Sequence, residues 1–207
     1  MKNFFLYTIS TMVLCYEFSA FAQTAAENLL SKGEFKAVKA GSKLPTKYWN
    51  IYYNKAAKGK FIEDKSFKGK GQVLEIVNSV PKTFGVLNPI PCIELTKPGI
   101  YRASIWVKGG ENIAPISTKW GKKCAVRILL RRSKPIKYFG IRKSLFKPIL
   151  KDWKRYEFEF YAPESELGNG LFYFRVDITG RGTFYIAKPS LEKINETEVV
   201  KKKIESR

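Results

Sequence analysis

The sequence contains no histidine among its 207 residues, and this excludes the Ser-His-Asp and Cys-His nucleophile systems. It also removes the commonest side-chain ligand of transition metals. Cysteine is scarce: after the N-terminal segment only Cys92 and Cys124 remain, and their spacing fits no zinc site. In an oxidising compartment the two could form a disulfide, and two buried free thiols are the alternative. Beyond the N-terminal segment, no apolar run approaches the roughly 20 residues that a membrane-spanning helix needs.

The first residues resemble a secretory signal. Lys2 precedes an apolar stretch from Phe4 to Cys15, and an Ala-x-Ala site ends at Ala22. We therefore expect residues 1–22 to be a signal peptide, 23–194 to form one domain and 195–207 to be a polar tail. A buried N-terminal helix is the alternative for the first segment. The signal predicts a secreted or periplasmic protein with no transmembrane segment after cleavage.

Acidic residues are few relative to basic ones, with 18 Asp and Glu against 38 Lys and Arg, for a formal charge of +20. Such a field attracts polyanions, and we expect an anionic envelope polymer or polysaccharide as partner. Nucleic acid is not the partner we expect. Because the lysines are spread along the chain and not packed into one run, charge kept only for solubility is an equal alternative. Nothing in the sequence indicates the oligomeric state.

The body of the chain reads as short alternating runs separated by Gly, Pro, Asn and Lys, which predicts an all-β, two-sheet antiparallel sandwich. In the run 101–108 the odd positions from Tyr101 are apolar or small, whereas the even positions carry Trp106 between cations. Because a strand sends successive side chains to opposite faces, the odd set is expected in the core. The expected strands are EFKAV, YWNIYY, KFIEDK, QVLEIV, CIEL, YRASIWVKG, AVRILLRR, RYEFEFYA, LFYFRVDI and TFYIAKPSLEKI.

Four segments in order resemble a known family. NLLSKGEF is similar to an Asn-Leu-x-x-Asn-Gly-Asp-Phe opening, and IELTKPGIYRASIWVKG to a strand, Pro-Gly turn and Tyr-x-x-Ser-x-Trp-x-Lys strand. WKRYEFEFYAPE and GTFYIAKPSLEK resemble the segments that follow. The family comprises the carbohydrate-binding modules of families four, nine and twenty-two, which are galactose-binding-like jelly rolls. The resemblance covers about residues 28–194 and implies a jelly-roll domain with a sugar-binding face.

The sequence departs from this family at two places. The closing strand has Ala187 and Lys188 where the family often has two aspartates, one of them a usual ligand of a structural calcium. A lysine repels a divalent ion and Glu34 alone is a poor remnant, so we expect no calcium and no other cofactor. The segment 131–153 is unusually long and basic, and it could form a rim beside the binding face or a surface hairpin.

Candidate ligand-binding residues follow from the alternation. Trp106 shares its predicted face with Arg102 and Lys108, while charged faces of other strands offer further polar and aromatic groups. If these strands share a sheet, aromatics and arginines line one groove that suits a uronic acid or sulfated sugar. The alternatives are a cation–aromatic ladder on an ordinary sheet surface, or a reversed register that buries Trp106. The full predicted set is Trp106, Arg102, Lys108, Tyr173, Arg175, Asp177 and Arg127, together with Trp49 and Tyr52. The last two lie, with Tyr53, in an early segment where the family that the sequence resembles often has binding aromatics.

Catalytic residues are not expected. Glu157 and Glu159 lie two apart on one strand, whereas retaining glycosidases hold their carboxyls about 5 Å apart across the sugar. Because arginines lie nearby in the sequence, we interpret these two glutamates as compensating positive charge. The leading hypothesis is a non-catalytic carbohydrate-binding module for an anionic or neutral polysaccharide. The alternatives are an envelope interaction protein of the same fold without sugar binding, and a histidine-free polysaccharide lyase.

Overall fold

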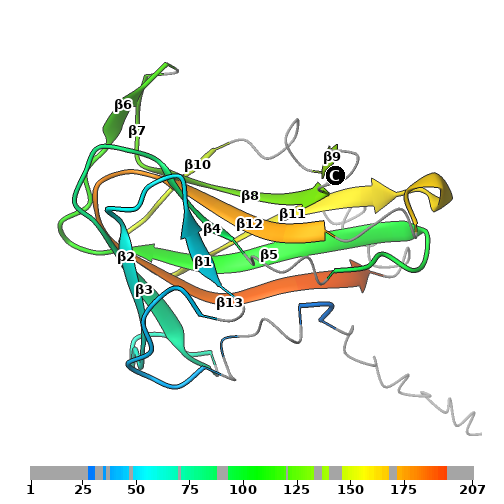
Figure 1. Ribbon diagram of the computed structural model, residues 1–207, viewed down its shortest axis with the longest axis horizontal. Coiled ribbons are helices and arrows are strands. Elements are labelled where there is room, and N and C mark those ends of the chain that lie inside the picture. The colour runs from blue at the N-terminus through cyan, green and yellow to red at the C-terminus, as the bar shows by residue number, and fades with distance from the viewer. Residues whose placement is uncertain are drawn as a thin grey trace, which may run out of the picture.

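The structure is a computed structural model that describes residues 28–30, 35, 38–46, 49–69, 71–87, 93–119, 121–132, 137–139, 146–167 and 172–194. These residues form two large antiparallel sheets that pack face to face, together with a small hairpin that projects from one end (Figure 1). No α-helix occurs in the described part of the chain. The all-β sandwich expected from the alternating runs is confirmed.

The first sheet, called the β5 sheet here, has the order β11-β5-β13-β3-β2. Strand β5, which lies between β11 and β13, alternates as the sequence predicted, with Tyr101 2% exposed and Ala103, Ile105 and Val107 fully buried. Trp106 is half-buried on the opposite face, so the reversed register is excluded. The strands are β11 (Lys154–Ala162), β5 (Gly99–Gly109), β13 (Gly182–Ile194), β3 (Val73–Asn78) and β2 (Lys58–Ile62).

The second sheet, called the β12 sheet, has the order β1-β4-β12-β8-β10, and β9 also pairs with β8. On β12, Phe172, Phe174, Val176 and Ile178 are buried against the core. The strands are β1 (Asn50–Tyr52), β4 (Phe84–Leu87), β12 (Phe172–Thr179), β8 (Ala125–Arg132), β10 (Lys147–Pro148) and β9 (Lys137–Phe139). The projecting hairpin is β6 (Ile116–Thr118) with β7 (Gly121–Lys123).

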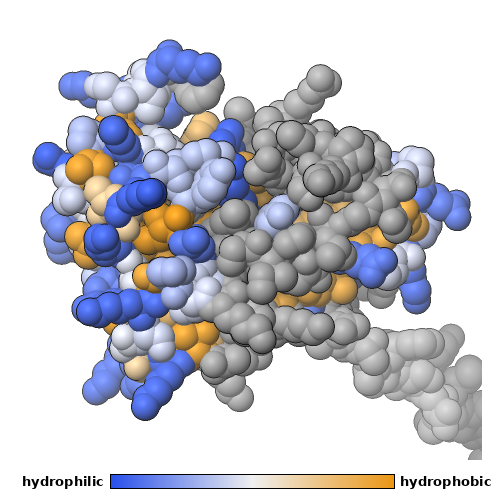
Figure 2. All heavy atoms as spheres, viewed as in Figure 1, coloured by the Kyte–Doolittle hydropathy of each residue, from blue (hydrophilic) through white to orange (hydrophobic). Residues whose placement is uncertain are grey.

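One hydrophobic core fills the space between the inner faces of the two sheets. Aromatic rings meet edge to face in it: Phe35 contacts Trp49 at 5.2 Å and Phe61 at 5.0 Å between ring centroids. Each fully buried ring of this size contributes about 1.5–3 kcal/mol through removal of apolar area from water. Polar side chains surround this core, and Figure 2 shows the hydrophilic ones at the end with the β6–β7 hairpin, with hydrophobic residues in small separate areas.

The Asn-Leu-Leu segment near the N-terminus is tied to β13 by the side chain of Asn28. Its Oδ1 accepts hydrogen bonds from the backbone N–H of Leu30 at 3.0 Å and of Leu191 at 3.1 Å. Its Nδ2 donates to the carbonyl oxygen of Pro189 at 3.3 Å. Leu30 is thereby held in the core with no exposed surface. The asparagine of the Asn-Leu-Leu segment therefore has a structural role.

Most of the long predicted strands are present within a residue or two of their expected ends. The structure differs at the short ones. CIEL contributes an isolated bridge from Ile93 to Phe172, because its neighbours form no ladder in the described part of the chain. Phe35 and Val38, the described residues of EFKAV, lie outside any strand. Strand β4 and the β6–β7 hairpin were not predicted.

The basic segment 131–153 turns back along β8. Lys137–Phe139 pairs with Leu130–Arg132, and Lys147–Pro148 pairs with Ala125–Val126. This pairing agrees with a surface hairpin at the edge of the β12 sheet. Within the described residues, no helix is long and apolar enough to cross a membrane. The predicted signal peptide and the predicted C-terminal tail lie outside the described residues.

Candidate functional site

The predicted site residues other than the buried Trp49 lie on two opposite faces of the sandwich. Trp106 belongs to the β5 sheet, whereas Tyr173, Arg175 and Asp177 belong to β12 and Arg127 to β8. The single groove predicted for these side chains is therefore wrong, because their strands do not share a sheet. Sequence alternation fixes which side chains point outward from a strand but not which strands pair. Two separate clusters have to be considered.

The cluster on the outer face of the β12 sheet is centred on Asp177, which is 1% exposed. Its carboxylate accepts two hydrogen bonds from Arg175, from Nε at 2.6 Å and from Nη2 at 2.9 Å. It accepts a third from Nη2 of Arg127 on the neighbouring strand. One buried carboxylate thus orients two guanidinium groups. Burial alone would lower the pKa of Arg175, but the hydrogen bonds and charges of Asp177 and Tyr53 raise it above its usual value.

Two exposed tyrosines stand beside this network. Tyr52, 44% exposed, pairs with Gly85 at the end of β1, and Tyr53 is 60% exposed. Strand alternation would send consecutive side chains to opposite faces, but Tyr53 has a left-handed backbone with φ of 69°. Its ring therefore covers the Arg175 guanidinium at 4.4 Å, and its hydroxyl accepts a hydrogen bond from Nη1 of that arginine. The two tyrosine rings lie 4.3 Å apart.

Gly85 on β4 leaves the space that this network occupies. A Cβ at this position would lie 2.9 Å from Oδ1 of Asp177 and 3.4 Å from Nε of Arg175. The first distance is shorter than any ordinary contact, so a side chain here would displace the carboxylate. The glycine was not among the predicted site residues. Its location inside an apolar run was the one signal in the sequence, since glycine within a strand often marks a close approach of other groups.

Arg127 extends the cluster toward Phe146, whose ring lies 4.7 Å from its guanidinium carbon. Its Nε is buried and has no hydrogen-bond partner among the described residues. Tyr173 is half-buried on the same outer face as Arg175, two positions earlier on β12. Of the predicted residues, the structure therefore brings together Tyr52, Arg127, Arg175 and Asp177, with Tyr173 on the same face.

On the outer face of the β5 sheet, the predicted cations are paired with acids. Arg102 donates from Nε and Nη2 to Oε1 of Glu159 at 3.0 and 2.9 Å. Lys108 donates to Oδ2 of Asp64 at 2.7 Å and to Oγ of Ser66 at 2.8 Å. Burial alone would raise the pKa of Asp64, but these hydrogen bonds and the lysine charge lower it. Both cations thus have structural partners.

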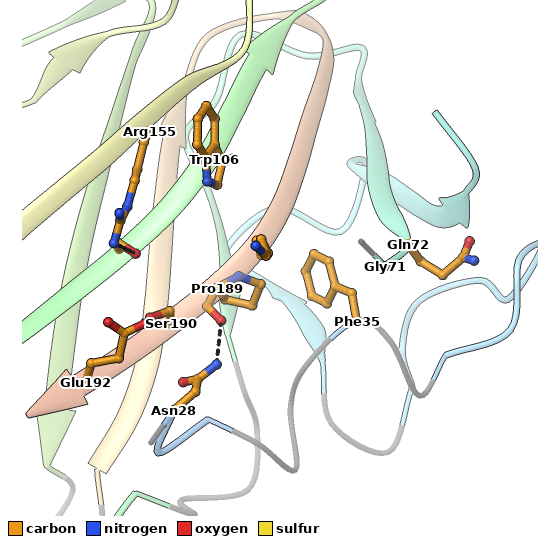
Figure 3. A pocket seen from close by; sticks show the side chains of 11 residues that line it. Asn28, Phe35, Gly71, Gln72, Trp106, Arg155, Pro189, Ser190 and Glu192 are labelled. Atoms are coloured by element: carbon orange, nitrogen blue, oxygen red, sulfur yellow. Dashed lines mark hydrogen bonds between the residues drawn. The ribbon is translucent and has the colours of Figure 1, made fainter. Parts of the chain in front are cut away.

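Trp106 separates two cavities on this face. The first, about 320 Å³, contains Trp106 and Arg155, which project from the neighbouring strands β5 and β11 (Figure 3). The second, about 690 Å³, lies on the side of Phe67 and Trp153. Trp106 and Lys188 border both. The remaining lining residues of the first cavity are Asn28, Phe35, Gly71, Gln72, Ser104, Pro189, Ser190 and Glu192; those of the second are Ser66, Lys68, Gly69, Lys108, Lys151 and Asp152.

Trp49 cannot take the binding role predicted for it, because its side chain has no exposed surface and packs in the core. The possible disulfide involves Cys92, which lies outside the described residues, and its partner Cys124 is half-buried. Burial raises the pKa of the Cys124 thiol.

Ala187 and Lys188 stand where the family often has two aspartates. Ala187 is buried beside Trp106, and Lys188 is exposed. No group of three or more His, Cys, Asp or Glu residues gathers in the described ranges; Glu34 lies outside them.

The two glutamates on β11 are charge-compensated, as the sequence suggested. Glu159 pairs with Arg102, and Glu157 lies 3.3 Å from Nε of Arg155. On the other face, Asp177 is enclosed by two guanidinium groups. A general acid or base has to exchange a proton with a bound substrate. These three carboxylates are engaged in holding cations, which suits a binding surface.

No family model matches the chain, and no curated protein matches its sequence. Solved structures are similar in fold. The CBM22-1 xylan-binding domain of Paenibacillus barcinonensis Xyn10C is 13% identical, with a TM-score of 0.50 over 77% of this chain and 99% of that domain. The CBM22-1-GH10 modules of Clostridium thermocellum Xyn10B, complexed with xylohexaose, are 10% identical, with a TM-score of 0.50 over 79% of this chain and 29% of that one.

The enzymatically active domain of tailspike protein 4 from bacteriophage CBA120 is 12% identical, with a TM-score of 0.53 over 81% of this chain and 21% of that chain. The chain thus has the jelly-roll fold of carbohydrate-binding modules. At these identities the similarity establishes the fold. The jelly roll spans nearly the whole xylan-binding domain but only a fifth to a third of the other two chains.

Proposed function

We propose that this protein is an exported, non-catalytic carbohydrate-binding module that binds polysaccharide on the outer face of its β12 sheet. The observation that carries the proposal is the pair of exposed tyrosines, Tyr52 and Tyr53, beside a buried Arg–Asp–Arg network. The fold supports it, since the xylan-binding domain has the same architecture. Export rests on the signal-like pattern of residues 1–22.

The chemistry of this face suits a sugar. A pyranose has apolar C–H faces, which pack on aromatic rings, and hydroxyls around its rim, which need hydrogen-bond partners. Tyr52 and Tyr53 supply the rings at low conformational cost, because a tyrosine side chain has only two rotatable torsions. Arg127 supplies donors at the rim of the same face. Because Asp177 fixes both guanidinium groups before the ligand arrives, little ordering remains to be done on binding.

The charge of the cluster bears on the class of polysaccharide. Two guanidinium groups and one carboxylate leave a net charge of +1 beside the tyrosines. This face accepts a neutral sugar and adds attraction for one carrying a carboxylate or sulfate. The partner we propose is therefore a neutral or anionic polysaccharide, including an anionic envelope polymer.

Affinity electrophoresis tests the proposal. The protein is run through gels that contain xylan, β-glucan, galactan, pectin or alginate, and we expect at least one to retard it. Retardation by the uncharged polysaccharides among these should be lost in the double variant Tyr52→Ala/Tyr53→Ala. The matched control is Tyr161→Ala on β11: its side chain is 61% exposed, like that of Tyr53, but it lies on the other sheet.

Two results would contradict the proposal. One is the absence of retardation by every polysaccharide at low salt, which would favour an interaction protein that keeps the fold without sugar binding. The other is retardation that occurs only with pectin or alginate, disappears in moderate salt and is unchanged by the double tyrosine variant. That pattern would indicate attraction between opposite charges without a sugar platform on the β12 sheet.

A further inference from the structure

We propose that the outer face of the β5 sheet carries a second ligand site, for an acidic saccharide: a sugar ring that bears a carboxylate or a sulfate. It lies on the opposite side of the sandwich from Tyr52 and Tyr53 and does not depend on the function proposed for that face. Its centre is Trp106, at the boundary of the two cavities.

An aromatic wall lines the larger cavity. Phe67 lies 6.0 Å from Trp106 and 4.8 Å from Trp153 between ring centroids, so the three rings form one apolar surface. The indole N–H of Trp153 donates to Oγ of Ser66 at 3.1 Å, which fixes this ring. A volume of about 690 Å³ falls within the range of small-molecule sites, roughly 300–1,000 Å³.

The charges at this wall are predominantly positive. Among the described lining residues, four are lysines and one, Asp152, is an acid. Lys108 is held by Asp64 and Ser66, and Lys151 pairs with Glu111. Lys68 and Lys188 are exposed and have no partner among the described residues. Two unpaired ammonium groups therefore remain at the rim for an anionic ligand.

The backbone places Lys188 at this site. Ala187, on β13, faces outward beside Trp106, so simple alternation would turn the next side chain into the core. A register shift between Ala187 and Ser190 interrupts the ladder, and Lys188 has a left-handed backbone with φ of 49°. Bulges of this kind re-aim a side chain, and strained backbone is often retained at functional sites. Here the bulge directs a cation to the boundary of both cavities.

The smaller cavity supplies partners for sugar hydroxyls. Ser104 accepts a hydrogen bond from Nη2 of Arg155 at 3.2 Å, and both side chains line it. Oε1 of Gln72, another lining residue, is buried and has no partner among the described residues. A saccharide of two or more rings can therefore lie across Trp106, with polar groups on one side and lysines on the other. This combination of an aromatic wall, amide and hydroxyl groups and unpaired lysines favours an acidic sugar over an isolated anion.

Isothermal titration calorimetry with defined ligands tests the site: trigalacturonate for carboxylates, a chondroitin sulfate tetrasaccharide for sulfates, uncharged galactotriose and inorganic sulfate. We expect at least one acidic saccharide to bind and inorganic sulfate to bind far more weakly. The double variant Lys68→Gln/Lys188→Gln should raise the Kd for the acidic saccharide about tenfold or more. The charge-matched control, Lys82→Gln/Lys122→Gln, removes exposed lysines that line neither cavity and should change binding less than about twofold.

Trp106→Ala should abolish acidic-saccharide binding. If the alanine variant does not fold, Trp106→Phe, which keeps the apolar packing, is used in its place. The double variant Tyr52→Ala/Tyr53→Ala should leave acidic-saccharide binding at this face intact, so failure of the β12 site and failure of this one are distinguishable. The proposal is overturned if neither acidic saccharide binds. It is also overturned if the two double lysine variants weaken binding equally, or if inorganic sulfate binds as tightly as the acidic saccharide.

Discussion

Replacing Asp177 with asparagine removes the negative charge that holds Arg127 and Arg175. The carboxylate is 1% exposed and accepts hydrogen bonds from both guanidinium groups. An asparagine keeps the shape but offers one acceptor and an NH₂ group that faces cations. Removing one partner of a buried ion pair costs about 3–5 kcal/mol, because an uncompensated charge remains. For a chain of this size, each kcal/mol corresponds to about 2–4 °C in Tm, so we expect a decrease of about 6–20 °C.

Differential scanning calorimetry measures this decrease directly. The control is Glu111→Gln, which breaks an ion pair with Lys151 at side chains that are 86% and 59% exposed. Exposed pairs contribute about 0–1 kcal/mol, so the control should shift Tm by no more than about 4 °C. If Asp177→Asn shifts Tm no more than the control does, the carboxylate does not organise this face, and the reasoning fails.

Three further predictions concern Gly85, Asp64 and Cys124. Gly85→Ala places a methyl group 2.9 Å from the present position of Oδ1 of Asp177, and should lower both Tm and polysaccharide retardation; unchanged values for both would mean that the strand shifts without disturbing the network. Burial alone would raise the pKa of Asp64, but Lys108 and Ser66 hold it below its usual value of 3.8. The folded state therefore binds this proton less readily than the unfolded state, and the stability advantage of the native protein over Asp64→Asn should be present above about pH 4 and decline as the pH falls through the lowered value. Urea titrations across pH 2–7 would show this, and a gap that widens toward low pH would contradict it. Burial raises the pKa of the Cys124 thiol, so iodoacetamide should modify it more slowly at pH 8 than it modifies free cysteine, and equal rates in mass spectrometry would count against its burial.

The sequence predicts side-chain direction well where long strands alternate. Tyr101 and Trp106 lie on opposite faces of β5 as expected, because a period of two follows from strand geometry alone. The same holds for the buried and outer sets of β12. Strand β4 was missed because it is only four residues long and contains Gly85, which weakens the strand signal.

The candidate site was harder to predict because it depends on strand pairing. Trp106 and Arg175 lie on equally convincing outward-facing positions, yet they belong to different sheets. Two local exceptions to alternation add residues that the pattern assigns to the core. Tyr53 and Lys188 each have a left-handed backbone, and each is thereby directed outward. Trp49 shows the converse: it immediately precedes β1, but its side chain is enclosed by Phe35 and the core.

The most direct test of the account is chemical-shift mapping by NMR with the uncharged oligosaccharide whose parent polysaccharide retards the protein most. The account predicts that the perturbed amides cluster on β1, β4, β8 and β12, with the largest changes at Tyr52, Tyr53, Gly85 and Arg175. Perturbations confined to the β5 sheet or to the β6–β7 hairpin would contradict a saccharide platform on the β12 sheet.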